Sequence, residues 1–212
     1  MALIGKHLLN SILLPVTIRV VEEFFAKNFP PAVEMLPFLL YIYGSCLKYS
    51  VLLVMYFSLI DKIESLEPGK RIVATKSLSL AEEYLRDHFP NFPVMPGVLM
   101  LESLTQATAW LIRVSENFAH SVVVLKEVRN VKYARFVQPG QTLIIESEIV
   151  QETENLVTLR AEGSVEGQNN LKAKLVLCRY NLSDTDPSQT LIDNKLTAEM
   201  RQRLKNLYRP MM

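Results

Sequence analysis

The feature of this sequence that most constrains its fold is a run of residues, 98–113, that is apolar on almost every side of a helix. The run reads V-L-M-L-E-S-L-T-Q-A-T-A-W-L-I-R and is long enough for about four helical turns. A helix that is apolar on every face must be buried on every face, because water would otherwise surround its hydrophobic side chains. The rest of the domain is therefore expected to enclose this helix.

The segments around this helix predict the elements that enclose it. Two segments after it, 141–150 and 156–165, alternate apolar and polar residues, as strands with one solvated face do. One apolar helix followed by an antiparallel meander predicts an α+β fold in which a sheet wraps around the helix. The expected strands are 71–78, 121–128, 141–150, 156–165 and 171–177, with a turn at 138–141 and a hairpin loop at Gln168–Asn170.

Composition limits the classes of function. The chain is 49% hydrophobic and 21% charged, which supports a substantial core and excludes global disorder. The 23 basic residues balance the 22 acidic ones, so the chain lacks the positive excess of a nucleic-acid binder. The two cysteines and three histidines show no metal-ligand spacing, and neither a disulfide framework nor a metal site is expected.

The beginning of the chain differs in composition from the rest. Only seven charged residues lie in residues 1–60, and Leu36–Ile60 contains one charge, Lys48. The length and hydrophobicity of Leu36–Ile60 fit a membrane-spanning helix, whereas Gly44 and Ser45 near its middle fit two buried helices or strands. No small-residue cleavage site follows the first apolar run, so we expect no cleaved export signal.

These differences divide the chain into three parts. Residues 1–57 form an apolar N-terminal extension that is expected to be helical, and its role stays open between membrane association, partner binding and residues upstream of a start at Met55. Residues 58–180 form the main domain. Residues 181–212 form a polar tail with a short helix, for which Thr197 is the expected N-cap.

The residues with the most chemical potential lie between His88 and Gln106. Three prolines at a spacing of three exclude a helix and place His88 on a stiff loop ahead of the buried helix. Gly97 permits close approach of a ligand at the helix start, where free backbone N–H groups stabilise developing negative charge. Burial between leucines predicts a raised pKa for Glu102, which makes it a proton donor near neutrality. Gln106, one turn later, lies on the same face and is expected to hydrogen-bond to Glu102.

Each of these residues also has a structural interpretation. A lone histidine beside prolines is usually a surface residue, and Pro-Gly before a helix is common. Glu102 is also a candidate for a buried ion pair with Lys132 or Arg135. Taken one at a time, these residues do not define a function.

Taken together, the segment resembles the active-site motif of FabZ-type 3-hydroxyacyl-acyl-carrier-protein dehydratases, H-F-P-x-x-P-V-x-P-G-V-L-x-x-E-x-x-x-Q. Every fixed letter is present, with Glu102 fourteen residues after His88. Two flanking segments agree, S-L-I-D-K-I-E-S-L-E-P-G-K-R-I-V-A at 58–74 and N-V-K-Y-A-R-F-V-Q-P-G at 130–140. The resemblance extends over residues 58–180.

The resemblance implies a hotdog fold, an antiparallel sheet around a long central helix, and dehydration of 3-hydroxyacyl-acyl-carrier protein to the trans-2-enoyl product in fatty acid biosynthesis. His88 matches the histidine that removes the proton beside the thioester carbonyl, and Glu102 the carboxylate that assists departure of the 3-hydroxyl as water. The Gly97 N–H matches the donor that polarises the carbonyl, and Val98 and Gln106 are expected to contact substrate. No metal or organic cofactor is implied.

The resemblance also implies partners. Acyl-carrier protein, which is acidic, requires a basic patch, and the candidates are Lys126, Arg129, Lys132 and Arg135. In the family, the histidine and glutamate of one site come from different subunits, which makes a homodimer the minimum active unit and leaves a trimer of dimers open. A cytoplasmic location is expected, and no nucleic-acid partner.

Two other functions stay open. An acyl-thioesterase on the same fold is the alternative enzyme. A non-catalytic acyl-binding or scaffold protein is the alternative from another class, because a typical stand-alone member lacks such an N-terminal extension and the family usually has Gly where this chain has Asp87.

Overall fold

The computed structural model describes residues 57–209. The chain divides into two compact units, Met1–Ser58 and Leu59–Met212, and the described residues lie almost entirely in the second. The predictions for the N-terminal extension, including most of the apolar stretch 36–60, fall on residues that the structure does not describe. Within 57–209, no helix is both long enough and apolar enough to span a bilayer.

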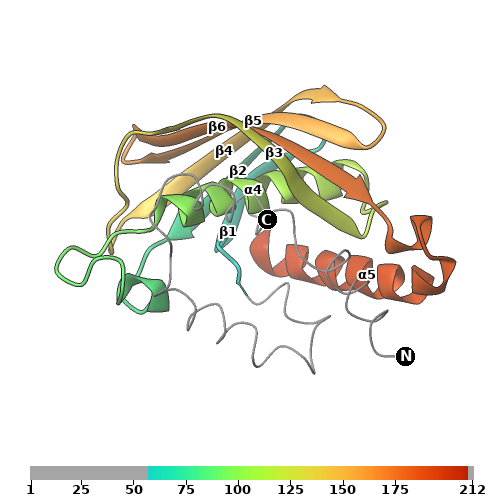
Figure 1. Ribbon diagram of the computed structural model, residues 1–212, viewed down its shortest axis with the longest axis horizontal. Helices are drawn as coiled ribbons and strands as arrows, with labels where there is room; N and C mark the ends of the chain where they lie inside the picture. The colour runs from blue at the N-terminus through green and yellow to red at the C-terminus, as the bar shows by residue number, and fades with distance from the viewer. Residues whose placement is uncertain (1–56, 210–212) are drawn as a thin grey trace, which may run out of the picture. The chain divides into compact units, whose positions relative to one another are not determined.

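The second unit contains a six-stranded antiparallel sheet that curves over one long helix (Figure 1). The strand order is β1-β2-β4-β5-β6-β3, so β2 pairs with β4 although the long helix and β3 lie between them in sequence. This arrangement confirms the α+β prediction. The strands are β1 (Lys62–Glu67), β2 (Arg71–Ser77), β3 (Val122–Tyr133), β4 (Thr142–Glu152), β5 (Leu156–Val165) and β6 (Gln168–Tyr180).

The long helix is α4 (Gly97–Ser115), and it packs against the inner face of the sheet. Most of its residues from Met100 to Ile112 are buried, as its composition predicts. Small residues on β5 allow the close approach of helix and sheet. A Cβ added to Gly163 would lie at van der Waals distance, 3.7 Å, from Leu104 Cδ2 on α4, and only 3.0 Å from Leu143 Cδ1 on β4, so a larger residue would force the Leu143 side chain to shift.

Two local features differ from the predictions. β1 is an additional strand, in which a register shift between Ile63 and Ser65 breaks the apolar alternation that would have predicted it. The β5–β6 hairpin turns at Glu166 and Gly167, both with positive φ, whereas Gln168–Asn170 belong to β6. A two-residue turn with positive φ at both positions matches the strand twist, so a longer loop is unnecessary.

The C-terminal tail begins with two 3₁₀ turns, Leu182–Asp184 and Pro187–Gln189, and continues as the helix α5 (Thr190–Leu207). The predicted N-cap at Thr197 is therefore wrong, since Thr197 lies inside the helix and its Oγ1 donates to the Asp193 carbonyl at 3.0 Å. The helix is also longer than expected. The burial of Asp193 and Met200 shows that tertiary contacts stabilise it.

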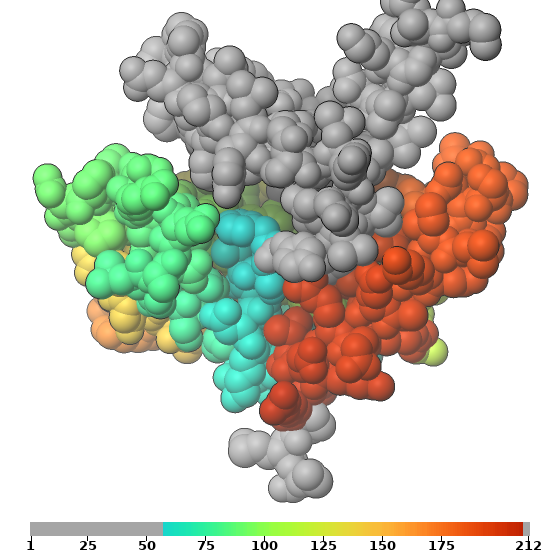
Figure 2. All heavy atoms as spheres, turned by 90° about the horizontal axis from the view of Figure 1, so that it is seen from below, coloured from blue at the N-terminus to red at the C-terminus, as the bar shows by residue number. Residues whose placement is uncertain are grey.

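α5 lies at the end of the unit away from the proline-rich loop 86–96. Figure 2 shows the underside, where α5 (red) lies beside β1 and β2 (cyan) and the segment with the loop (green) lies on their other side. A third 3₁₀ turn, η3 (Glu83–Leu85), leads into that loop. The loop therefore meets the N-terminus of α4, whereas the tail packs near its C-terminus.

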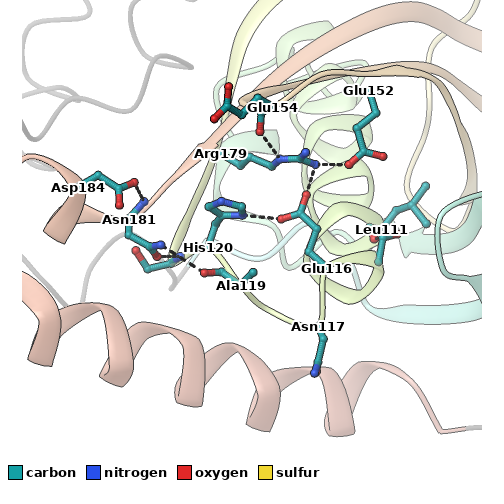
Figure 3. Close-up of polar contacts among 12 residues, drawn as sticks. Leu111, Glu116, Asn117, Ala119, His120, Glu152, Glu154, Arg179, Asn181 and Asp184 are labelled. Carbon is teal, nitrogen blue, oxygen red and sulfur yellow. Dashed lines mark hydrogen bonds and ion pairs between the residues drawn. The ribbon is translucent and has the colours of Figure 1, made fainter.

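A buried arginine ties the C-terminal end of α4 to the sheet (Figure 3). Arg179 on β6 pairs with Glu116 and, at 2.6 Å, with Glu152 at the end of β4. The His120 Nδ1 lies 2.6 Å from the second carboxylate oxygen of Glu116. Because Arg179 also donates to the backbone carbonyls of Thr153 and Glu154, its guanidinium is well satisfied despite its burial.

Candidate active site

His88 lies on the loop before α4, as predicted, and two hydrogen bonds join it to Val94 within this loop. Its Nδ1 lies 3.0 Å from the Val94 carbonyl oxygen, and its own carbonyl accepts from the Val94 N–H at 3.2 Å. A carbonyl oxygen only accepts, so Nδ1 must carry the hydrogen and neutral His88 keeps its lone pair on Nε2. The loop thus presents one defined basic nitrogen.

Glu102 lies on the second turn of α4 with Gln106 beside it. The Gln106 Nε2 donates to Glu102 Oε1 at 3.1 Å, which confirms the predicted hydrogen bond. The Gln106 Oε1 in turn accepts from the backbone N–H of Leu59 at 2.9 Å. The other oxygen of Glu102, Oε2, is buried and has no hydrogen-bond partner among the described residues.

This environment changes the acidity of Glu102. Burial raises the pKa of the Glu102 carboxyl to about 7, and the hydrogen bond from Gln106 opposes the rise only in part. A carboxyl group with such a pKa is substantially protonated at neutral pH. Glu102 therefore fits the role of a general acid, for which a pKa near the working pH is best.

Gly97 and Val98 form the first turn of α4. The first N–H groups of a helix have no acceptor within it and point out of its N-terminus. The Tyr133 ring at the end of β3 lies against Gly97, where an added Cβ would come within 3.1 Å of the ring carbon Cε1. A larger residue at this position would therefore force the Tyr133 ring to shift by a few tenths of an ångström.

Residues after β3 hold the loop in place, and the sequence interpretation gave them no role. The Met95 N–H donates to the Val137 carbonyl at 2.9 Å. The buried Asn170 side chain donates to the Phe136 carbonyl at 3.0 Å and accepts from the Val165 N–H. Phe136 and Val137 belong to the flanking motif at 130–140, but only the fold shows that this segment contacts the loop before α4.

The structure brings Gln106 to Glu102, and Gly97 and Val98 to the same end of α4. Within the described residues of one chain, no hydrogen bond joins His88 to Glu102. The alternative in which Lys132 or Arg135 pairs with Glu102 is wrong, because both are exposed and Glu102 has no ion pair among the described residues. In residues 57–209, no cluster of histidine, cysteine or carboxylate side chains is arranged to hold a metal ion.

The fold and this site agree with sequence comparisons. A model of the FabA-like domain family matches residues 52–174, and the chain belongs to this family. Its sheet and central helix therefore form a hotdog fold.

Curated relatives carry a more specific name. A protein of Pediococcus pentosaceus named 3-hydroxyacyl-[acyl-carrier-protein] dehydratase FabZ is 39% identical over 115 residues, which cover 54% of this chain and 77% of the relative. A protein of the same name from a Janthinobacterium species is 36% identical over 133 residues, covering 61% and 85%. The chain is thus similar to dehydratases of the FabZ type over its central part.

Solved structures give weaker likenesses. A chain of the dehydratase heterocomplex ApeI:P from Xenorhabdus doucetiae is 23% identical, with 54% of this chain and 93% of that chain covered and a TM-score of 0.43. An acetyl-CoA-bound protein of Streptococcus mutans is 17% identical, with coverage of 56% and 86% and a TM-score of 0.45. The family assignment rests on the sequence matches.

Proposed function

We propose that this protein dehydrates 3-hydroxyacyl-acyl-carrier protein to the trans-2-enoyl thioester in fatty acid biosynthesis. The observation that carries the proposal is the state of Glu102, a carboxyl with a raised pKa and one buried oxygen without a partner among the described residues. A hydroxyl group leaves as water readily only if an acid protonates it, and the raised pKa of Glu102 suits this carboxyl group to that task. The FabZ name of the curated relatives supports the same reaction.

Each residue has a defined step in this reaction. His88 Nε2 takes the proton from the carbon beside the thioester carbonyl, and the electron pair of that C–H bond forms the new double bond. Glu102 gives its proton to the 3-hydroxyl, whose bond to carbon breaks as water leaves. The Gly97 N–H donates to the carbonyl oxygen, which gains negative charge as the proton departs, and Val98 lines the same helix start.

The outer face of the sheet supports acyl-carrier protein as the carrier. Strand register places Arg129 (β3), Lys174 (β6) and Arg160 (β5) side by side, and Lys132 beside Lys172. Only Arg129 and Lys172 among these five have a carboxylate partner in the described residues. We name these five residues the cationic row. The row ends at Lys132, next to Tyr133, which lies on the opposite face of β3 and covers Gly97.

The cationic row extends the sequence prediction. Arg129 and Lys132 were expected, whereas Arg160, Lys172 and Lys174 join them only through strand pairing. The other two candidates from the sequence, Lys126 and Arg135, are not part of the row. Arg135 donates to the side chain of Gln168. An acidic carrier protein would gain favourable charge contacts along this row.

A homodimer is the proposed minimum unit. β3 is the last strand of the sheet and, in the described chain, leaves one edge without a neighbour. Such an edge presents free backbone donors and acceptors to a second copy. Separate subunits would then supply His88 and Glu102 to one site, which agrees with the lack of a hydrogen bond between them within the described chain.

The test is hydration of a trans-2-enoyl thioester. The loss of the conjugated-enoyl absorbance measures hydration, and a free-thiol assay detects any hydrolysis of the thioester. The full-length wild type should hydrate both the acyl-carrier-protein ester and its N-acetylcysteamine ester. His88→Ala and Glu102→Gln should each lose activity by ~10²-fold or more on both substrates while staying folded. Release of thiol by the wild type would favour the thioesterase, and binding without turnover would favour the acyl-binding protein.

The same assay tests the carrier. Lys174→Glu should raise KM for the carrier-protein ester and leave the N-acetylcysteamine ester unaffected, because only the former has an acidic surface. Lys195→Glu, at an exposed lysine on α5 outside the row, is the matched control for the same change of charge. Equal effects of Lys174→Glu on both substrates would contradict a docking role.

A cytoplasmic location and membrane association of the extension stay predictions, which cell fractionation of the full-length protein measures.

A further inference from the structure

The side-chain amide of Gln106 is held in one orientation by the protein backbone. Its oxygen accepts from the Leu59 N–H at 2.9 Å, and its nitrogen donates to Glu102 Oε1 at 3.1 Å. A backbone N–H can only donate, so the amide oxygen must face Leu59 and the NH₂ group must face Glu102. Leu59 is 1% exposed, which keeps its N–H at this position.

This orientation makes the two oxygens of Glu102 unequal. The NH₂ group of Gln106 has no lone pair to offer, so Glu102 Oε1 must act as an acceptor in both protonation states. Oε2 is buried and has no partner among the described residues. A neutral carboxyl group carries one hydrogen, and the oxygen already engaged by an N–H donor is the poorer place for it.

We propose that Gln106 is a positioning residue, locked by the Leu59 N–H, that keeps the transferable proton of Glu102 on Oε2. This inference rests on the proposed dehydration. In that reaction the O–H bond at Oε2 breaks, the proton passes to the 3-hydroxyl oxygen, and the C–O electron pair leaves with the water. Glu102 remains as a carboxylate that accepts the Gln106 hydrogen bond at Oε1.

This role differs from the substrate contact expected of Gln106. The proposed role concerns the two hydrogen bonds that its amide makes within the protein, to the Leu59 N–H and to Glu102 Oε1. The hydrogen bond from the Leu59 N–H to Gln106 Oε1, which we call the lock, also joins two distant parts of the chain. Leu59 lies 47 residues before Gln106, just ahead of β1. Among the described residues no charged side chain pairs with Glu102, so the Gln106 amide is its one identified polar contact.

The test uses Gln106→Met in the full-length protein, because methionine fills a similar volume without the amide. We expect kcat to fall by about tenfold with KM nearly unchanged, since the loss is in proton delivery. The alkaline limb of the kcat profile should move to higher pH, because the hydrogen bond that favours the charged carboxylate is gone. A rise in KM with kcat unchanged would instead assign Gln106 to substrate binding and overturn the proposal.

A second pair of variants tests the lock itself. Leu59→Pro removes the N–H donor, and Leu59→Val, with a side chain of similar size to proline, keeps it. Leu59→Pro should shift the pH profile in the same direction as Gln106→Met, whereas Leu59→Val should keep the wild-type profile. Identical profiles for the two Leu59 variants would show that the backbone donor does not orient the amide.

A readout without turnover separates this inference from the proposed function. With ¹³C-labelled glutamate side chains, the Glu102 resonance, assigned by its loss in Glu102→Gln, reports the titration directly. A higher Glu102 pKa in Gln106→Met than in wild type would support the lock, whether or not the wild type hydrates enoyl thioesters. Failure of the wild type to hydrate them would overturn only the proposed reaction. An unchanged titration would overturn the lock even in an active enzyme.

Discussion

At the scale of single residues, the site depends on groups whose protonation is set by their surroundings. The Val94 carbonyl defines the tautomer of His88, and burial raises the pKa of Glu102. The residue types and spacing of this pair were evident in the sequence. The hydrogen-bond partners were only partly evident, because Gln106 is one turn away from Glu102 whereas Leu59 is remote in sequence.

Burial of Glu102 should cost stability at neutral pH. Its pKa rises from 4.5 to about 7 on folding, so the unfolded chain loses this proton first and wild-type stability falls between pH 4.5 and pH 7. Glu102→Gln keeps a neutral polar group at all pH values. We expect it to equal wild type near pH 4 and to be more stable by about 3 kcal/mol at pH 8.

Urea unfolding from pH 4 to pH 8, at one protein concentration, measures this difference. Glu148→Gln on the outer face of β4 is the control, since it removes an exposed carboxylate. A constant difference between Glu102→Gln and wild type across this range would contradict the assigned burial.

At the scale of elements, the tail is attached through a buried carboxylate. Asp193 on α5 accepts from the Ser121 hydroxyl, from the Leu182 N–H at 3.0 Å and from the Ser183 N–H at 2.9 Å. Burial by itself would raise the pKa of Asp193, but these hydrogen bonds outweigh it and hold the pKa below its usual value. Arg201 adds a second contact, at 2.9 Å from its Nη1 to Asn117 Oδ1.

Asp193→Ala should detach the tail, because three donors lose their acceptor. The loss should be about 2–4 kcal/mol in the stability of this element. Hydrogen exchange of the amides in residues 182–207 measures it, with Asn194→Ala, an exposed change on the same helix, as the control.

The wild-type contact should also depend on pH. The Asp193 pKa is lowered by folding, so its stabilisation is present above the ordinary aspartate pKa and is lost as pH falls through the lower folded value. Equal exchange rates in Asp193→Ala and wild type at neutral pH would rule out this attachment.

At the scale of the whole molecule, the proposed active site requires two subunits. If His88 and Glu102 of one site come from different chains, a dimer of one His88→Ala and one Glu102→Gln chain contains one intact site. Random mixing of these inactive proteins should then restore about a quarter of wild-type activity, because half of the dimers are mixed and each has one of two sites intact.

The measurement is enoyl hydration after co-expression with two different tags, with each variant expressed alone as the control. If both residues of a site came from one chain, each chain in the mixture would lack one of them and the mixture would stay inactive.

The sequence by itself determined the central helix and the alternating strands, and it predicted the residues that we propose to react. These features are local, since burial on a helix or strand follows from the order of apolar residues along a short segment. It missed β1, where a register shift breaks the alternation, and the start of α5, which is stabilised by tertiary contacts such as the burial of Asp193.

Only the tertiary structure decided which residues meet. The Leu59 lock on Gln106, the Tyr133 ring on Gly97 and the alignment of Arg160 with Lys174 join segments that are apart in the chain. Such contacts depend on strand order and register, which one segment does not contain. The order of residues along the chain therefore predicted the candidate reacting groups, whereas the fold set their orientation, burial and partners.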